Sequence, residues 1–221
     1  MGPLPAGRHE SRITHKWVVP CYLGQFRGTI DVFEEARLLG STEKSIRLQT
    51  QKGTDIPNLI ELEPGEQQRR VYRLFRETFG KRWKERKPVT GVYNCAGHVW
   101  ASRRTAILAK EDTEDTAVWR LILEEDGYRR LPEGEHPCSG DLVLYFDREK
   151  GWYLHVGEVL WPQKGIAEGS PPIPLVLSKW NSVSGETIHS AFDVPYSQQG
   201  YDLQIEFWTD RPAPTTQQGS S

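Results

Sequence analysis

The chain has 221 residues, of which 37% are hydrophobic, and this size suits one medium domain with a real core. Its formal net charge of −2 argues against a general nucleic-acid binder, which is normally basic. Because the sequence has no apolar run of about 18 residues and no apolar secretory signal, we expect a protein that does not span a membrane. We expect it to be cytoplasmic, or exported without a classical signal peptide.

The amino-terminal part of the chain predicts mixed structure. Residues 1–12 and 211–221 are rich in Gly, Pro or polar residues and are expected to be flexible ends. Between them, 13–88 forms a predicted mixed α/β portion with a short helix in "TIDVFEEARLL". A stronger helix is predicted in "GEQQRRVYRLFRETFGKRWKER", where Val71, Phe75, Phe79 and Trp83 recur every four residues. Its Arg and Lys residues are interpreted as a solvated face.

The carboxyl-terminal part, 89–210, predicts two helices followed by several strands. One helix begins near Cys95, with Ala96, Val99, Trp100 and Ile107 on one side, and a second, "EDTAVWRLILEED", ends at Gly127. Strand patterns follow in "DLVLYFD", "GWYLHVGEVLW", "PLVLSKW" and "YDLQIEFW", with a loop in "PQKGIAEGSPPIP". This order predicts an α+β domain in which helices pack on an antiparallel sheet.

The cysteines are Cys21, Cys95 and Cys138, an odd number at wide spacing. Such a set predicts neither a disulfide framework nor a zinc site, and no other metal or cofactor motif is present. Cys95 is the candidate nucleophile, because the first turn of a helix lowers the pKa of a thiol and offers N–H groups to an oxyanion. Asn94 is a plausible helix cap, and Gly97 has no side chain that would block the backbone near the sulfur.

A catalytic thiol needs a histidine within reach, and the chain has six. His155 is favoured because it lies inside a strand-like run, "WYLHVGEV", where a polar ring is unusual and indicates a specific role. The structural alternative is a half-buried histidine with satisfied hydrogen bonds. His98 is a rival at i+3 from Cys95, but we expect its side chain to point along the helix face rather than across the sulfur. Cys21 and Cys138 are interpreted as packing residues.

Four segments in order, "YNCAGHVWA", "EEDGYRRL", "CSGDLVLYF" and "YLHVGEVLW", resemble the NlpC-type cysteine peptidases and the related CHAP amidases. The resemblance covers residues 90–196 and implies a reduced papain-like fold. It implies Cys95 as nucleophile and His155 as base, with Tyr93 and Asn94, which precede the nucleophile, as residues that bind the oxyanion or position the reacting groups. The chain departs from the family pattern at Asn94, at Ala96–Gly97 and at Ser139, where Asp, Ser–Gly and Pro are usual.

The resemblance also implies a third polar residue on the strand after the histidine, to orient the imidazole. Alternation in "PLVLSKWN" makes Ser178 the first choice and Asn181 the second, and His189 is a further alternate. Lys179 is expected to point elsewhere, because a cation does not stabilise imidazolium.

The leading hypothesis is a peptidase or amidase that cleaves an amide bond through a Cys–His acyl-enzyme mechanism. Its expected partner is a peptide or amide substrate, or a protein target, with no cofactor, nucleic acid or membrane. One alternative is a binding or regulatory module that keeps the fold without the chemistry. Another is a thiol-dependent acyltransferase or deamidase effector.

Overall fold

The computed structural model of the chain describes residues 44–60, 63–108, 115–163, 173–180 and 183–213. The helices are α2 (Glu66–Phe79), α3 (Cys95–Trp100), α4 (Asp115–Glu125) and the 3₁₀-helix η1 (Pro195–Gln198). The strands are β1 (Asn58–Leu59), β2 (Lys84–Lys87), β3 (Ala106–Ile107), β4 (Arg129–Arg130), β5 (Leu142–Asp147), β6 (Trp152–Gln163), β7 (Ile173–Lys179), β8 (Glu186–Ser190) and β9 (Leu203–Thr209). None of the helices in these ranges is both long and apolar enough to cross a lipid bilayer.

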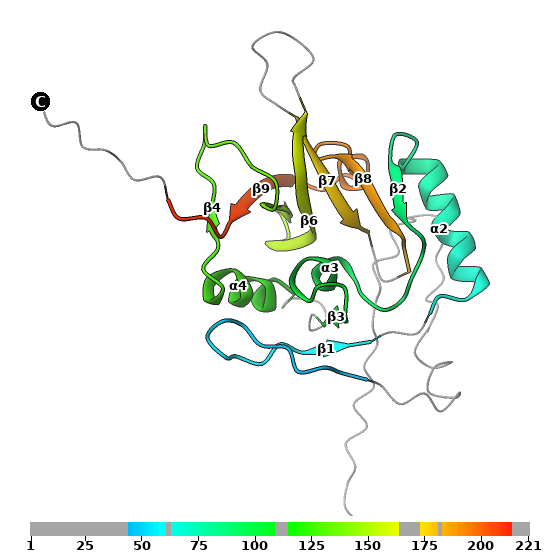
Figure 1. The fold of residues 1–221 in the computed structure, drawn as a ribbon. Coiled ribbons are helices and arrows are strands. Elements are labelled where there is room, and N and C mark those ends of the chain that lie inside the picture. Colours follow the sequence, from blue (N-terminus) through cyan, green and yellow to red (C-terminus); the bar gives the residue numbers. More distant parts are fainter. Residues whose placement is uncertain (1–43, 61–62, 109–114, 164–172, 181–182, 214–221) are drawn as a thin grey trace, which may run out of the picture.

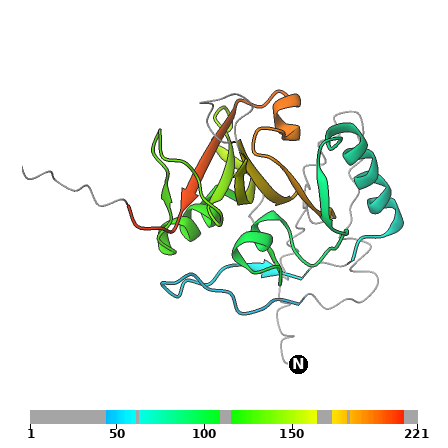
Figure 2. The same ribbon diagram turned by 45° about the horizontal axis from the view of Figure 1, so that its top comes forward.

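The centre of the fold is a seven-stranded sheet of order β2-β8-β7-β6-β5-β9-β4, in which each neighbouring pair is antiparallel. A separate two-stranded pair is formed by β1 and β3. Figure 1 shows α3 and α4 on one side of the sheet, with α2 beside β2 at one end. Figure 2 shows the same arrangement turned by 45°. The predicted α+β class with an antiparallel sheet is confirmed.

The sheet continues across the domain boundary expected at residue 88. β2 precedes that residue and pairs with β8, with Lys84 opposite Ile188. Ile56, still earlier in the chain, is buried in the core beneath α4. Residues 44–60 and 63–87 therefore pack with the later part instead of forming a separate unit. The helix expected at 29–39, Cys21, the end at 1–12, most of the 211–221 tail and the middle of the 162–174 loop lie outside the described residues.

The amphipathic helix predicted before residue 88 is confirmed as α2, but it is shorter than its apolar stripe. It ends at Phe79, with Gly80 as its cap, so Trp83 lies beyond it. Trp83 is nevertheless buried, and its ring lies 5.7 Å from that of Phe75, centroid to centroid. The period of four therefore marked Phe75, Phe79 and Trp83, which pack together in the core, but it overstated the length of the helix and missed Tyr72, the buried residue of α2.

The helix that begins at Cys95 is also shorter than predicted. α3 ends at Trp100, and Ile107 belongs to β3. Ser102 and Arg103 follow the helix with φ of 50° and 65°, a left-handed conformation that non-glycine residues rarely adopt. Gly97 allows α3 to pack closely against Thr105, because a Cβ at this position would lie 1.8 Å from the carbonyl oxygen of Thr105. Only glycine permits this approach.

Apolar side chains cover both faces of the sheet. In β5 successive side chains point to opposite faces, and apolar residues lie on both. Leu142 and Leu144 belong to a core beneath α3 and α4, and we call this side the helix face. Val143 and Tyr145 belong to a second core on the other side, which we call the rear face. Further members of the rear core are Trp83, Val176, Trp180, Ala191, Val194 and Tyr196.

Candidate functional site

Cys95 is the first residue of α3, as predicted, and is partly exposed. The side chain of Asn94 caps this helix by accepting a hydrogen bond from the backbone N–H of Gly97 at 2.8 Å. The Asn94 amide also donates to the carbonyl of Ile107 at 2.8 Å, so it ties α3 to β3. Because its donor is used in this way, Asn94 has a structural role here and does not offer that N–H to an oxyanion. Cys95 itself packs against the helix-face core.

His155 lies on the rear face. Antiparallel pairing places it opposite Tyr145, and the next residue, Val156, opposite Leu144. Val156 therefore shares the helix face with Cys95, and His155 points the other way. Its ring is fully buried and stacks on Trp180, with centroids 4.7 Å apart. The structure does not bring Cys95 and His155 together, because the sheet lies between them.

Ser178 and His189, the predicted third residue and one alternate, join His155 on the rear face. Ser178 lies opposite Thr187 in the β7–β8 pair, and His189 lies opposite the rear-core residue Val176. His189 also contacts Trp180, with ring centroids 4.6 Å apart. The structure therefore gathers these predicted partners, but on the face opposite the thiol. Asn181, the second choice for the third residue, lies outside the described residues.

Most polar atoms of these rear-face side chains are buried without a hydrogen bond, apart from Nδ1 of His189, which lies 2.8 Å from the carbonyl oxygen of Ser190. Both ring nitrogens of His155, Oγ of Ser178, Oγ1 of Thr187 and Nε2 of His189 have no partner. Burial lowers the pKa of His155 well below its usual value, and the neighbouring His189 lowers it further. Burial likewise lowers the pKa of His189, to about 4. Both rings are neutral near pH 7.

Lys179 points away from the rear face, as expected. It is fully buried on the helix face, where its Nζ donates to the carbonyl of Thr90 at 2.8 Å and to that of Ser184 at 2.6 Å. The ammonium also lies 5.1 Å from the centre of the Tyr93 ring, a cation–π distance. Through these contacts, Lys179 holds the segment before α3 against the sheet.

A buried carboxylate, Glu186, is the electrostatic centre of the helix face. Tyr93 donates its hydroxyl to Glu186 at 2.7 Å, and Arg103 donates Nε at 2.6 Å. Arg86 lies 3.1 Å away, and Nδ1 of His98 lies 3.4 Å from Oε1. Burial alone would raise the pKa of Glu186, but the contacts from His98, Tyr93 and Arg103 outweigh burial and hold the pKa far below its usual range. Glu186 is therefore ionised.

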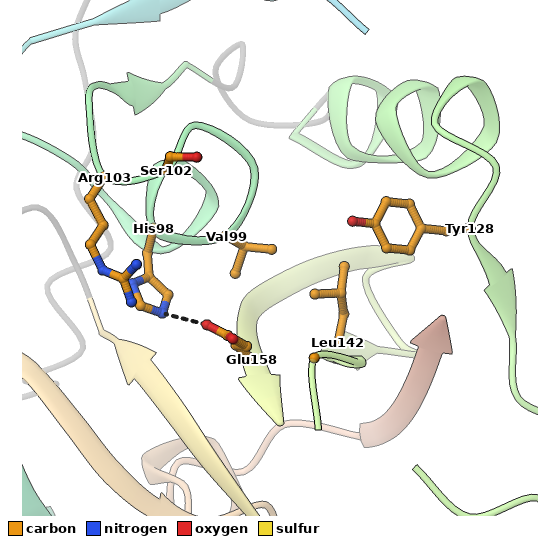
Figure 3. Close-up of a pocket in the computed structure, with 8 residues that line it drawn as sticks. His98, Val99, Ser102, Arg103, Tyr128, Leu142 and Glu158 are labelled. Atoms are coloured by element: carbon orange, nitrogen blue, oxygen red, sulfur yellow. Dashed lines mark ion pairs between the residues drawn. The ribbon is translucent and has the colours of Figure 1, made fainter. Parts of the chain in front are cut away.

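His98 connects this carboxylate to a pocket of about 200 Å³. The ring is buried, with Nδ1 towards Glu186 and Nε2 4.0 Å from Oε2 of Glu158. Figure 3 shows His98 and Arg103 on one side of the pocket and Tyr128 and Leu142 on the other, with Glu158 between them. A carboxylate behind an imidazole, with a cavity in front, is the arrangement that orients a general base.

Sequence reasoning had considered His98 but missed Glu186, Glu158 and Arg103. In β8, Thr187 and Ile188 favour a strand, but the run is too short to reveal which face Glu186 takes. Glu158 is the one acidic residue in a mainly apolar strand, which is a signal of the same kind that drew attention to His155. The positive φ of Ser102 and Arg103 has no sequence signature, because neither is glycine.

The "CSGDLV" segment has a structural explanation. Asp141 accepts a hydrogen bond from the backbone N–H of Cys138 at 2.7 Å and pairs with Arg211 at 2.6 Å. Gly140 has φ of +90°, which the turn into β5 requires. This motif therefore positions the entry to β5. Cys138 is exposed at that turn, not packed behind the strand as expected.

In the part of the chain that the structure describes, no group of three or more His, Cys, Asp or Glu side chains is arranged to hold a metal ion. Comparisons of the chain with protein-family models, with curated proteins and with solved structures gave no match. The arguments for function accordingly come from the geometry of this chain alone.

Proposed function

We propose that the chain is a cysteine-dependent amide hydrolase with a papain-like arrangement, in which Cys95 is the nucleophile and His98 is its base. One observation carries the proposal: His98 lies one helical turn after Cys95, and its ring is held between Glu186 and a pocket. The placement of α3 against β6 and β7 of an antiparallel sheet is the feature that agrees with the papain-like reading.

The spacing supports a Cys95–His98 pair. Side chains at i and i+3 are neighbours on a helix, with Cβ atoms about 5–6 Å apart. With Nδ1 of His98 held towards Glu186, Nε2 is the nitrogen left for proton exchange. Hydrogen bonds between catalytic groups are often long without substrate and shorten when the substrate binds. His98 therefore takes the role that the sequence had suggested for His155.

The proposed reaction follows from these positions. His98 accepts the proton of the Cys95 thiol, and the thiolate attacks the carbonyl carbon of the amide. The imidazolium, stabilised by ionised Glu186, then gives its proton to the leaving amine as the C–N bond breaks. Water, deprotonated by His98, attacks the thioester, releases the acid and restores the thiol. In this scheme Glu186 is a positioning residue.

The test is the pH dependence of iodoacetamide labelling at Cys95, followed by mass spectrometry between pH 4 and 9. The background carries Cys138→Ser, because that exposed thiol also reacts. We expect Cys95 to react at pH values well below the pKa of an ordinary thiol, and His98→Gln to abolish this reactivity. His155→Gln is the matched control, because it changes a histidine on the rear face, and it should leave the profile unchanged.

The other outcomes separate the remaining hypotheses. If His155→Gln abolishes the low-pH reactivity and His98→Gln does not, the base is His155 and the proposal is wrong. A second candidate function, a binding module without thiol chemistry, is favoured by the fact that Cys95 is not among the residues lining the pocket. It predicts ordinary thiol behaviour in all three proteins.

A further inference from the structure

We propose that the helix face binds an oxyanion, a carboxylate or phosphate group of a ligand, through Arg86, Lys87 and Arg103, whose charges gather around the buried Glu186. The site borders the pocket, which Arg103 also lines. Binding of the anion does not depend on the thiol chemistry. One consequence does rest on the proposed hydrolase: its substrate is then an amide that carries an acidic group near the bond that is cleaved.

The first step concerns a bulge in β2. Glu85 lies opposite Thr187. Lys87 lies opposite the residue before it, Glu186, so β2 has one extra residue at this point. Such a bulge sets two residues of one strand against one residue of the other and redirects a side chain. Regular alternation would send Arg86 and Lys87 to opposite faces of the sheet. Instead both cations reach the carboxylate of Glu186, at 3.1 Å for Arg86 and 3.8 Å for Lys87.

The second step concerns the balance of charge around Glu186. Arg103 reaches the same carboxylate from the segment after α3, with its Nε 2.6 Å from Oε1. Within the described residues, Arg86, Lys87 and Arg103 form an ion pair with no other carboxylate. Three positive charges against one negative charge leave an excess of two. Like charges this close repel one another, so a further anion at this place is stabilising.

Other acidic groups nearby do not cancel this excess. Glu85 lies opposite the rear-face residue Thr187 and pairs with an arginine of α2. Glu158 faces Nε2 of His98, whereas Glu186 faces the other ring nitrogen, so the imidazole lies between Glu158 and the cluster. An imidazole is neutral or positive, and His98 therefore adds no negative charge in either state.

The third step concerns access from solvent. The side chains of Arg86 and Lys87 are 45% and 46% exposed, and that of Arg103 is 29% exposed, whereas that of Glu186 is buried. In the part of the chain that the structure describes, each guanidinium makes one hydrogen bond, to Glu186. A guanidinium has five N–H donors, so donors remain for a ligand. An anion that arrives from solvent meets the cations, with the carboxylate buried behind them.

The fourth step concerns the kind of anion. Guanidinium groups bind carboxylate and phosphate oxygens through paired N–H donors, and a lysine ammonium adds a compact charge. An excess of two positive charges complements a dianion better than a monoanion, and it repels a cation. The cluster therefore fits a phosphate monoester or a ligand with two carboxylates.

The test measures the binding of inorganic phosphate, succinate and acetate to the full chain by amide chemical shifts, at pH 7.5 and an ionic strength held constant with sodium chloride. At this pH phosphate and succinate are mainly dianions, and acetate is a monoanion. We expect at least one dianion to bind at least tenfold more tightly than acetate, with shifts centred on Arg86, Lys87 and Arg103. The tighter dianion identifies the oxyanion as phosphate or carboxylate. If neither dianion shifts these residues, or if acetate binds equally well, the proposal is wrong.

Charge-removing variants locate the site. The double variant Arg86→Gln with Lys87→Gln removes both excess charges and leaves Glu186 its contact with Arg103, so the tighter dianion should bind at least tenfold more weakly. Lys44→Gln with Lys52→Gln is the matched control, because it removes two charges from exposed lysines elsewhere, and binding should stay as in the parent protein. Equal weakening in both double variants would mean that only the overall charge acts, and it would refute the site.

A further variant separates this proposal from the enzymatic one. Cys95→Ala removes the proposed nucleophile and none of the three cations, so the dianion should bind to it as to the parent protein. Loss of thiol reactivity with intact binding would contradict the hydrolase alone. Intact thiol reactivity without binding of either dianion would contradict the anion site alone.

Discussion

The two faces of the sheet treat buried ionisable groups in opposite ways, and β8 shows both. Glu186 begins the strand on the helix face and stays charged, because Tyr93, His98 and Arg103 contact its carboxylate. His189, three residues later on the rear face, is neutral, because burial outweighs its contacts. A buried group keeps its charge where enough partners replace water, and loses it where the surroundings are aromatic.

This difference bears on function. The helix face has charge, a pocket and a partly exposed thiol, whereas the rear face holds predicted catalytic side chains within an aromatic core. Stacking of His155 on Trp180 and its complete burial leave the ring no access to solvent. Chemistry is therefore expected on the helix face and packing on the rear face, which the following variants test.

The largest expected effect comes from removing the charge at the centre of the helix face. Glu186→Gln leaves Arg103 and His98 without their carboxylate, and we expect it to lower the free energy of unfolding by about 3 kcal/mol. Urea unfolding at pH 7.5 measures this. Glu85→Gln, which breaks an exposed pair with Arg76, is the control and should cost less than about 1 kcal/mol. If both variants lose the same free energy of unfolding, the contacts of Glu186 stabilise the fold no more than an exposed ion pair does.

The rear face predicts a loss of stability in mild acid. The unfolded chain protonates His189 near pH 6.5, whereas the folded chain resists protonation until its pKa of about 4. The unfolded state therefore binds more protons between these values, so stability is intact above pH 6.5 and falls as the pH drops towards 4. For His189 alone the loss amounts to about 3 kcal/mol, at about 1.4 kcal/mol for each pH unit.

Urea unfolding at pH 7.5, 5.5 and 4.5 checks this window. His189→Phe and His155→Phe keep an aromatic ring against Trp180 and remove the titrating group, so each should flatten the decline. His136→Gln changes an exposed histidine and should leave the slope as in the parent protein. A decline equally steep in the Phe variants would show that the rear-face histidines do not control acid stability.

The smallest expected effect compares two tyrosine hydroxyls, one on each face. Tyr93 donates to ionised Glu186 at 2.7 Å, and Tyr145 donates to the backbone carbonyl of Ala191 at 3.1 Å. A hydrogen bond to a charged group is roughly twice as strong as a neutral one. We expect Tyr93→Phe to cost about 2 kcal/mol and Tyr145→Phe about 1 kcal/mol in urea unfolding. The reverse order would contradict the view that Tyr93 donates to an ionised Glu186.

The elements that sequence alone predicted are those with strong local signals. α2 and α4 follow from apolar residues at helical spacing, and β5, β6, β7 and β9 from apolar runs of strand length. The cap at Asn94 was also predictable, because a cap depends on neighbours within one turn. β8 was missed, since its five residues mix a carboxylate, two β-branched residues and a histidine, a pattern without clear alternation.

The make-up of the candidate site was decided by the tertiary structure. Whether His155 or Val156 faces Cys95 depends on the register between β5 and β6, and a shift of one residue would exchange them. His98, Glu158 and Glu186 come from α3, β6 and β8, and no local pattern relates them. The sequence by itself determined the helices and strands with strong local patterns, such as α2, α4, β5 and β6, because those preferences act between near neighbours. Only the packed sheet decided which ionisable side chains share a face, because that depends on the pairing of strands far apart in the chain.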